Sequence, residues 1–225
     1  MEAKDVSKRN TRHRVGEYLY EPMEGVHMVH QGGQKEIFPG LRLYTGAFDF
    51  GDDWLDWLLD VEWWQPSMVG EDGRPEGDLR NSMGFRLDGA AKINSIAAEM
   101  DRTAYHIIDP LLTEYCIDYE LAGWRWTDEG YNLLLYEEGG FYARHCDNFG
   151  KGHHGRQISM VSFINDDYEG GQLHFPQIKV TLEPKKGDVA FFPSNWLFQH
   201  EALKVTKGTK ISLVSWYQAS MWEGE

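Results

Sequence analysis

The second half of the chain, from about residue 131, is a succession of short strand-like segments separated by tight turns. The segments are rich in β-branched and aromatic residues, and turn pairs such as Gly139-Gly140 and Asp166-Asp167 separate them. About eight such segments occur: YNLLLY, GFYARHCD, RQISMVSFIN, GQLHF, IKVTLEP, DVAFFP, LFQHEALKV and KISLVSWYQ. We therefore predict a jelly-roll or cupin-like barrel, that is, a double-stranded β-helix.

The first half has a different, helical pattern. Residues 41–48 predict one strand, and DDWLDWLLDVEWW at 52–64 predicts a short amphipathic helix. Apolar residues recur at helical spacing over 94–120, where Asp109-Pro110 predicts either two consecutive helices or one kinked helix. The glycine- and proline-rich stretch at 65–80 predicts a loop. The fold class expected is α+β, with the helices packed on one side of the barrel.

No change of composition marks a linker, so we predict a single domain over residues 1–225. Residues 131–217 would form the barrel core, and residues 1–130 would support it and shape substrate access. There are 22 Lys and Arg against 36 Asp and Glu, a net charge of −14. This balance argues against an extended nucleic-acid interface and against binding to anionic membranes.

The cysteine content points to a reducing compartment. Only Cys116 and Cys146 occur in 225 residues, too few for a disulfide framework. The first residues are charged where a secretory signal would be apolar, and no window approaches a membrane span in length. We therefore expect a cytoplasmic protein.

Three residues with metal-binding side chains fall within the strand-rich half: His145, Asp147 and, 55 residues later, His200. On a strand, His145 and Asp147 would project to the same face and Cys146 to the opposite one. Two histidines and a carboxylate form the facial triad of non-haem Fe(II) sites. One His-x-Asp is weak evidence in a chain with nine histidines, but its place among the strands strengthens it.

Lys210 follows the turn Lys207-Gly208-Thr209, ten residues after His200. A cation that projects into an apolar barrel is costly unless it meets an anion, and an acidic ligand would supply one. Ser212 would lie on the same strand face, so we count it among the contacts of that ligand. The alternative for Lys210 is a solvated lysine on an edge strand.

The runs YNLLLYEEGGFYARHCDN, RQISMVSFINDDYEGGQLHFP and LEPKKGDVAFFPSNWLFQHEALKVTKGTKISLVSWY together resemble the catalytic barrel of the 2-oxoglutarate- and Fe(II)-dependent dioxygenases of the prolyl 4-hydroxylase type. The resemblance covers residues 131–217. It implies that His145, Asp147 and His200 bind iron, and that Lys210 binds the distal carboxylate of 2-oxoglutarate.

The same resemblance bears on the walls of the cosubstrate pocket. Tyr136 matches a tyrosine that lines it, although packing in the core is an equally good reading of this residue. Tyr142 and Trp216 are candidate wall residues. Phe163 departs from the pattern, because some relatives have a hydroxyl-bearing residue there that helps to hold the distal carboxylate.

The function implied is hydroxylation of a prolyl residue in a peptide or protein, with dioxygen consumed and 2-oxoglutarate converted to succinate and carbon dioxide. Ascorbate is a candidate reductant. Two alternatives stay open: the same chemistry on a free amino acid or other small molecule, and a cupin-like metal- or ligand-binding module without turnover. Action on alkylated bases is disfavoured, because that branch uses two arginines where this chain has Lys210 and Trp216.

The sequence gives only weak predictions for the roles of the other histidines and of two tryptophans. His153 and His154 lie in a glycine-rich stretch, and His174 favours a structural or substrate-facing role, so none is expected to bind the metal. Trp63 and Trp64 could flank a substrate groove. The acidity of residues 49–78, if they border the site, predicts a neutral or basic substrate peptide.

Overall fold

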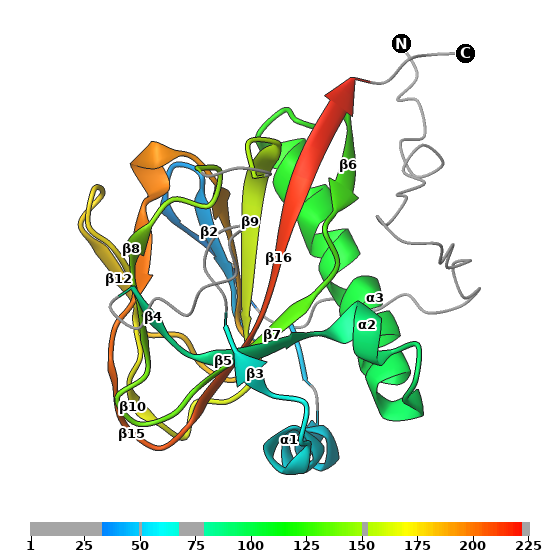
Figure 1. Cartoon of the computed structure of the whole chain (residues 1–225). Coiled ribbons are helices and arrows are strands. Elements are labelled where there is room, and N and C mark those ends of the chain that lie inside the picture. Colours follow the sequence, from blue (N-terminus) through cyan, green and yellow to red (C-terminus); the bar gives the residue numbers. More distant parts are fainter. Residues whose placement is uncertain (1–32, 50, 68–78, 150–152, 222–225) are drawn as a thin grey trace.

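Two antiparallel sheets form the framework of the chain and face each other across a shared core (Figure 1). The structure is a computed structural model that describes residues 33–49, 51–67, 79–149 and 153–221. The sheets form because alternate residues of the strands are apolar, so that each strand buries one face against the opposite sheet. This is the double-stranded β-helix, or jelly roll, and the predicted fold class is confirmed.

The larger sheet has nine strands among the described residues. In spatial order they are β1 (Gln34–Phe38), β2 (Leu41–Tyr44), β13 (Val189–Pro193), β9 (Arg156–Phe163), β16 (Lys210–Met221), β7 (Asn132–Tyr136), β5 (Met83–Arg86) and β3 (Gln65–Pro66), with β6 (Trp124–Asp128) also paired to β16. Strand β16 joins the two halves of this sheet, since it pairs with β9 on one side and with both β7 and β6 on the other.

The smaller sheet carries part of the site. Its strands, in spatial order, are β12 (Val180–Leu182), β11 (Leu173–Phe175), β14 (His200–Ala202), β8 (Phe141–His145) and β4 (Arg80–Asn81). A separate two-stranded ribbon consists of β10 (Glu169–Gly170) and β15 (Val205–Lys207). Because β14 lies beside β8, His200 is paired directly with His145.

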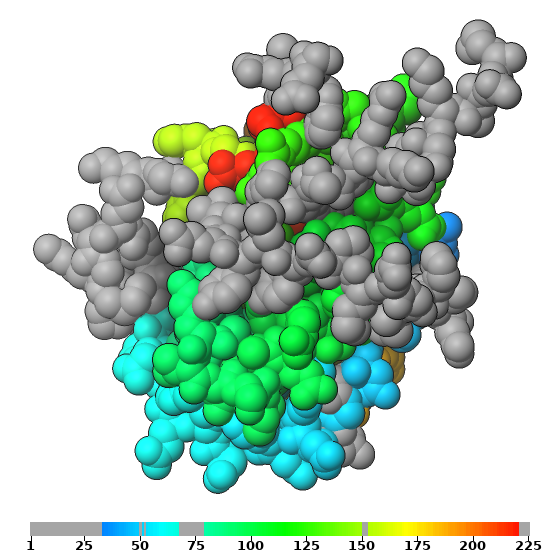
Figure 2. Space-filling model, turned by 90° about the vertical axis from the view of Figure 1, so that its right-hand side faces the viewer, coloured from blue at the N-terminus to red at the C-terminus, as the bar shows by residue number. Residues whose placement is uncertain are grey.

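The helices lie on the side of the larger sheet that faces away from the smaller one (Figure 1). They are α1 (Gly51–Asp60), α2 (Leu87–Ala90) and α3 (Ser95–Asp118). A short 3-10 turn, η2 (Trp196–Phe198), lies apart from them (Figure 1). Figure 2 views this helical side, with the green residues that include α2 and α3 above the cyan residues of α1. None of the helices in the described part of the chain is both long and apolar enough to cross a membrane.

Helix α3 is one continuous helix. Its first turn is capped by the side chain of Asn94, which accepts a hydrogen bond from the backbone N–H of Ala97 at 3.0 Å. The prediction that Asp109 caps a second helix is wrong, because Pro110 lies inside the helix. Pro110 is exposed, so its ring disturbs no packing.

Burial of one face of α3 explains why the helix continues through the proline. Met100, Ala104, Ile108 and Leu112 recur every four residues and are fully buried against the larger sheet. The hydroxyl of Tyr44 on β2 also donates to the carbonyl of Leu111 at 3.2 Å. These contacts outweigh the roughly 3 kcal/mol that an internal proline costs a helix.

Several sequence-based boundaries need correction. Residues 1–130 are more than a helical support, because they supply the strands β1 to β6, of which only β2 was predicted. The strand predicted at 41–48 ends at Tyr44, and the helix predicted at 52–64 runs from Gly51 to Asp60. Within the predicted loop at 65–80, residues 68–78 lie outside the described residues.

Candidate functional site

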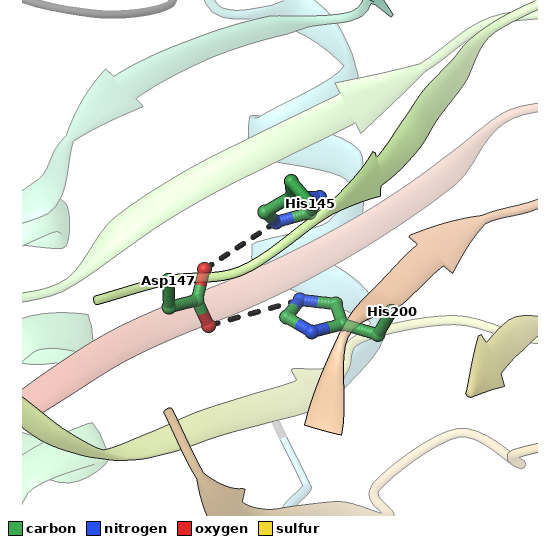
Figure 3. Close-up of side chains that lie close together, drawn as sticks. All are labelled: His145, Asp147 and His200. Atoms are coloured by element: carbon green, nitrogen blue, oxygen red, sulfur yellow. Dashed lines mark ion pairs between the residues drawn. The ribbon is translucent and has the colours of Figure 1, made fainter. Parts of the chain in front are cut away.

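His145, Asp147 and His200 meet at one point between the two sheets (Figure 3). One ligand atom from each lies within 4.8 Å of the others. The Nε2 atom of His145 is 3.3 Å from Oδ1 of Asp147, and Nε2 of His200 is 3.7 Å from Oδ2. The ligand atoms therefore converge as the donors of a single metal ion do.

The two imidazoles are oriented by backbone carbonyl groups. Nδ1 of His145 is 2.9 Å from the carbonyl oxygen of Ala143, and Nδ1 of His200 is 3.0 Å from that of Phe198. A carbonyl only accepts, so each Nδ1 carries the proton and each Nε2 offers a lone pair toward Asp147. Burial lowers the pKa of His200 to about 4, which keeps this ring neutral near pH 7.

Asp147 is ionised although it is buried. Burial alone would raise the pKa of its carboxyl, but His200, His145 and a hydrogen bond from Ser159 outweigh that effect and lower it below the usual range. The Ser159 hydroxyl donates to Oδ2 of Asp147 at 2.6 Å and contacts the Ser194 hydroxyl at 2.8 Å. The carboxylate is thus held in one orientation before any metal binds.

The chain leaves β8 at His145, so Asp147 does not lie on the strand as the period-2 argument assumed. The turn after the strand nevertheless brings the carboxylate beside the imidazole. Cys146 points away, and its thiol lies 3.1 Å from both the Ser194 carbonyl oxygen and Oδ1 of Asn148. Burial raises the pKa of this thiol, so it is a poor nucleophile at neutral pH.

A cavity of about 720 Å³ opens beside the triad. Lys210 and Ser212, both on β16, line it and are 2 % exposed. Nζ of Lys210 donates to the carbonyl of Gly171 at 2.6 Å, and no carboxylate of the described residues pairs with it. Burial lowers the pKa of Lys210 to about 7. The reading of Lys210 as a solvated edge lysine is wrong.

Ser212 has a buried hydroxyl that finds no partner in the described part of the chain. It is paired across the sheet with Phe163, the residue that departs from the hydroxyl-bearing pattern. Nζ of Lys210 lies 5.5 Å from the Phe163 ring centroid, so the cation and the free hydroxyl share one end of the cavity. A buried cation and an orphan donor form a pocket that a carboxylate would satisfy.

Tyr136 pairs with Lys210 in the ladder between β7 and β16, and its ring centroid is 5.3 Å from Nζ. It lines the cavity and also packs against Ala202 and Val205. Burial raises the pKa of its hydroxyl, although the charge of Arg80 and a hydrogen bond from it act in the opposite direction. Its role as a cosubstrate contact stays a prediction.

The other predicted wall residues line the same cavity. The Tyr142 ring stacks on His145, with centroids 3.7 Å apart and planes 17° apart. The Trp216 ring lies under the guanidinium of Arg156, at 3.7 Å from the ring centroid. Arg156 is itself held by Glu129 through contacts of 2.6 to 3.0 Å.

The histidines that were not expected to bind the metal lie outside the triad. His174 contacts the Thr181 hydroxyl at 2.8 Å, and His153 lines the cavity without joining the cluster. Trp63 and Trp64 do not line the cavity themselves; both pack edge-to-face against Phe85, which does line it.

Sequence reasoning missed Ser159, Gly171 and Arg80. The first orients Asp147, the second accepts from Lys210, and the third lies over Tyr142 at 4.4 Å from the ring centroid. None carries a local signal for its role, because each makes its contact with a residue that is distant in the sequence.

The fold and this site define a class: a double-stranded β-helix with two histidines, one carboxylate and a buried lysine in one cavity. Residues 131–218 match the family model described as 2OG-Fe(II) oxygenase superfamily, in agreement with the resemblance of residues 131–217. The superfamily uses Fe(II) and 2-oxoglutarate, as its description states. None of the curated protein sequences gives a significant match.

Solved structures share the fold at low sequence identity. A prolyl hydroxylase from Trichoplax adhaerens, in complex with a peptide fragment of the hypoxia inducible factor oxygen degradation domain, has a TM-score of 0.64 and 17% identity, covering 80% of this chain and 83% of its own. The viral collagen prolyl hydroxylase of Paramecium Bursaria Chlorella virus-1, as a 2OG complex, gives 0.57 and 18%, covering 80% and 97%. A Pseudomonas putida prolyl-4-hydroxylase gives 0.58 and 21%, covering 80% and 93%.

The residues present fit both groups that the superfamily uses. His145, Asp147 and His200 are a nitrogen and oxygen donor set suited to Fe(II), with the imidazole Nε2 atoms free to bind it. Lys210 and the unpartnered hydroxyl of Ser212 suit one carboxylate of a dicarboxylic acid.

Proposed function

We propose that this protein is an Fe(II)- and 2-oxoglutarate-dependent hydroxylase that acts on a prolyl residue in a peptide or protein. The observation that carries the proposal is the placement of the buried Lys210 ammonium in the same cavity as the triad. A module that only stores a metal has no need of a buried cation facing the metal ligands. The similarity to prolyl hydroxylase folds supports the prolyl substrate.

Each residue would have a defined task. His145, Asp147 and His200 would hold the metal on one side, which leaves the other side for reactants. Lys210 and Ser212 would bind the distal carboxylate of 2-oxoglutarate, so Ser212 would replace the hydroxyl that is absent at Phe163. When bound, Fe(II) and 2-oxoglutarate supply the oxidising chemistry that converts a C–H bond into C–OH, with dioxygen consumed and succinate and carbon dioxide released.

The walls would control water and orientation. Tyr142 covers the His145 ring, and Trp216 is fixed by the stacked guanidinium of Arg156. Both rings restrict solvent around the triad and narrow the space in which a substrate carbon can approach. Tyr136 would close the cavity beside Lys210. Ascorbate would serve as the reductant that restores Fe(II).

The test is succinate formation from 2-oxoglutarate with Fe(II) and dioxygen, together with mass spectrometry of prolyl peptides for the gain of one oxygen atom. We expect His145→Ala and Asp147→Ala to reduce succinate formation to the level of the metal-free protein. His174→Ala is the matched control, since His174 lies on β11 outside the cavity. Turnover retained in both triad variants would overturn the proposal.

The two alternatives predict different results. A non-catalytic cupin-like module would bind the metal but give no succinate and no dependence on Lys210. An enzyme for a free amino acid would give succinate, but oxygen would be gained by the small molecule and not by any prolyl peptide.

A further inference from the structure

Four cationic side chains line the described part of the cavity: Arg80, Arg86, Arg156 and Lys210. Arg156 is neutralised by Glu129, which it contacts through two nitrogens. Arg86 is an exposed residue that donates to both carboxylate oxygens of Asp88, at 3.0 and 3.1 Å. Lys210 has the cosubstrate role given above. Three of these cations are therefore accounted for.

Arg80 is different, because no carboxylate of the described residues pairs with it. Its Nε donates to the Ser82 hydroxyl at 2.8 Å. Its other neighbours in the cavity are the aromatic side chains of Tyr142 and Tyr136. A guanidinium has five N–H donors in a planar fork, and these neighbours among the described residues do not match its charge.

The position of Arg80 puts this charge close to the triad. Strand β4 pairs with β8, where Arg80 is directly opposite Tyr142, and the guanidinium carbon lies 4.4 Å from the ring centroid of Tyr142. The imidazole of His145 stacks on the same tyrosine at 3.7 Å. One aromatic ring therefore contacts both the guanidinium and a metal ligand, so an anion bound to Arg80 would lie next to the reaction centre.

A partly buried arginine on a cavity wall gains most from a planar anion that accepts two parallel hydrogen bonds. The distal carboxylate of 2-oxoglutarate is already matched by Lys210 and Ser212 at the β16 side of the cavity. What remains for Arg80 is the other molecule that must enter the same cavity, namely the substrate.

We infer that Arg80 binds a carboxylate of the substrate and thereby selects an acidic substrate over a neutral one. This inference rests on the proposed function and deepens it. The carboxylate could come from the α-carboxylate of a small molecule or chain end, or from an acidic side chain beside the target proline. An acidic substrate differs from the neutral or basic substrate that the acidity of residues 49–78 predicts. Residues 50 and 68–78 of that segment lie outside the described residues.

The experiment measures binding of matched probes to the protein loaded with Fe(II) and 2-oxoglutarate without oxygen, by titration calorimetry. N-acetyl-L-proline is compared with N-acetyl-L-prolinamide to test an α-carboxylate. N-acetyl-Asp-Pro-amide is compared with N-acetyl-Asn-Pro-amide to test an acidic side chain. We expect one acid to bind about tenfold more tightly than its neutral partner, as a charge-assisted hydrogen bond gives.

The variants assign that preference to a residue. Arg80→Gln should reduce the preference to less than about twofold, whereas Arg86→Gln should retain it because Arg86 is already neutralised by Asp88. Equal binding of both pairs, including no measurable binding of any probe, would overturn the inference. So would a preference that survives in Arg80→Gln, or a loss of 2-oxoglutarate affinity in Arg80→Gln as large as in Lys210→Ala.

The loading step separates this inference from the proposed function. Fe(II) and 2-oxoglutarate bound together absorb weakly in the visible range, and this band reports the loaded site before any probe is added. If the band forms and the probes are not distinguished, the role of Arg80 is wrong and the proposed function stands. If no band forms, the proposed function fails, and the inference fails with it.

Discussion

The Nζ atom of Lys210 lies 2.6 Å from the carbonyl oxygen of Gly171, and this single hydrogen bond is what holds a buried ammonium group at the end of the cavity. The two residues are 39 positions apart in the sequence. Under the proposed function, their contact would fix where 2-oxoglutarate places its far carboxylate, and it would make that binding sensitive to pH and to the backbone at Gly171.

Affinity for 2-oxoglutarate should fall as pH rises above 7. Burial lowers the pKa of Lys210 to about 7, so in the free protein its charge is lost above that pH, and binding of the anion then requires uptake of a proton. About half of the Lys210 side chains are protonated at pH 7 and about one in a hundred at pH 9. We therefore expect roughly 50-fold weaker binding at pH 9 than at pH 7. Anaerobic titration of the Fe(II)-loaded protein with 2-oxoglutarate measures this.

Lys210→Arg is the control for that prediction, because a guanidinium stays protonated throughout this range. Its affinity should be flat between pH 7 and pH 9. The pKa of His200 is about 4, and that of Asp147 is lowered, so neither changes charge in this interval. An equal decline in wild type and Lys210→Arg would contradict the assignment to Lys210.

Removal of the Ser159 hydroxyl should weaken metal binding. Ser159 donates to Asp147 at 2.6 Å, and loss of such an orienting contact typically lowers metal affinity by about 10- to 100-fold. Ser162→Ala is the matched control, since Ser162 is a buried serine on the same strand whose hydroxyl has no partner in the described structure. Titration with Mn(II), followed by electron paramagnetic resonance, distinguishes the two; equal affinities would exclude an orienting role for Ser159.

A side chain at position 171 should damage cosubstrate binding as well as stability. Gly171 has φ +66°, and an added Cβ would lie 3.1 Å from Cδ of Lys210. Gly139 also has a positive φ, of +85°, but its added Cβ would have no heavy atom within 4 Å. Both alanine variants should lose about 1 kcal/mol of unfolding free energy in urea, from backbone strain.

Only Gly171→Ala should also weaken 2-oxoglutarate binding, because only there does the methyl group displace the lysine side chain. Comparison of the two variants thus separates backbone strain from the local clash. If Gly139→Ala weakened 2-oxoglutarate binding to the same extent, the effect would be one of general stability.

Replacement of Pro110 by alanine should stabilise the protein. Pro110 lies inside α3 and is exposed, so alanine would restore one backbone hydrogen bond without loss of packing. An internal proline costs a helix about 3 kcal/mol, but it also stabilises the folded state by lowering the entropy of the unfolded chain. We therefore expect alanine to raise the free energy of unfolding by about 1 to 2 kcal/mol. Urea unfolding measures it, and an unchanged or lower stability would show that α3 has already relaxed around the ring.

The triad residues could be predicted from sequence because their chemistry is visible locally. His145 and Asp147 are two positions apart next to a strand, and Lys210 is a charge in an otherwise apolar strand. The side chains of His145 and Asp147 lie together as predicted, although β8 ends two residues before Asp147, because the following turn keeps the two side chains together.

The contacts that support the site could not be predicted in this way. Ser159 and Gly171 acquire their roles only in the folded chain. There Ser159 on β9 contacts Asp147, and Gly171, which follows β10, contacts Lys210 on β16. The strands β3, β4 and β5 have two to four residues each, too few for an alternating pattern, so Arg80 was hidden in a predicted loop. In α3 the proline predicted either two consecutive helices or one kinked helix; the chain forms one helix with Pro110 inside it, because burial of the opposite helix face favours its continuation.

Strand β16 has a consequence for how the protein is made. It follows every other strand of the larger sheet in the chain, and it joins β9 to β7 and β6 while it carries Lys210. A nascent chain on the ribosome can present His145, Asp147 and His200 before β16 has been synthesised, but the sheet behind them is then still open. Under the proposed function, Lys210, the residue for 2-oxoglutarate, would therefore be made after the three metal ligands, together with the strand that completes the sheet.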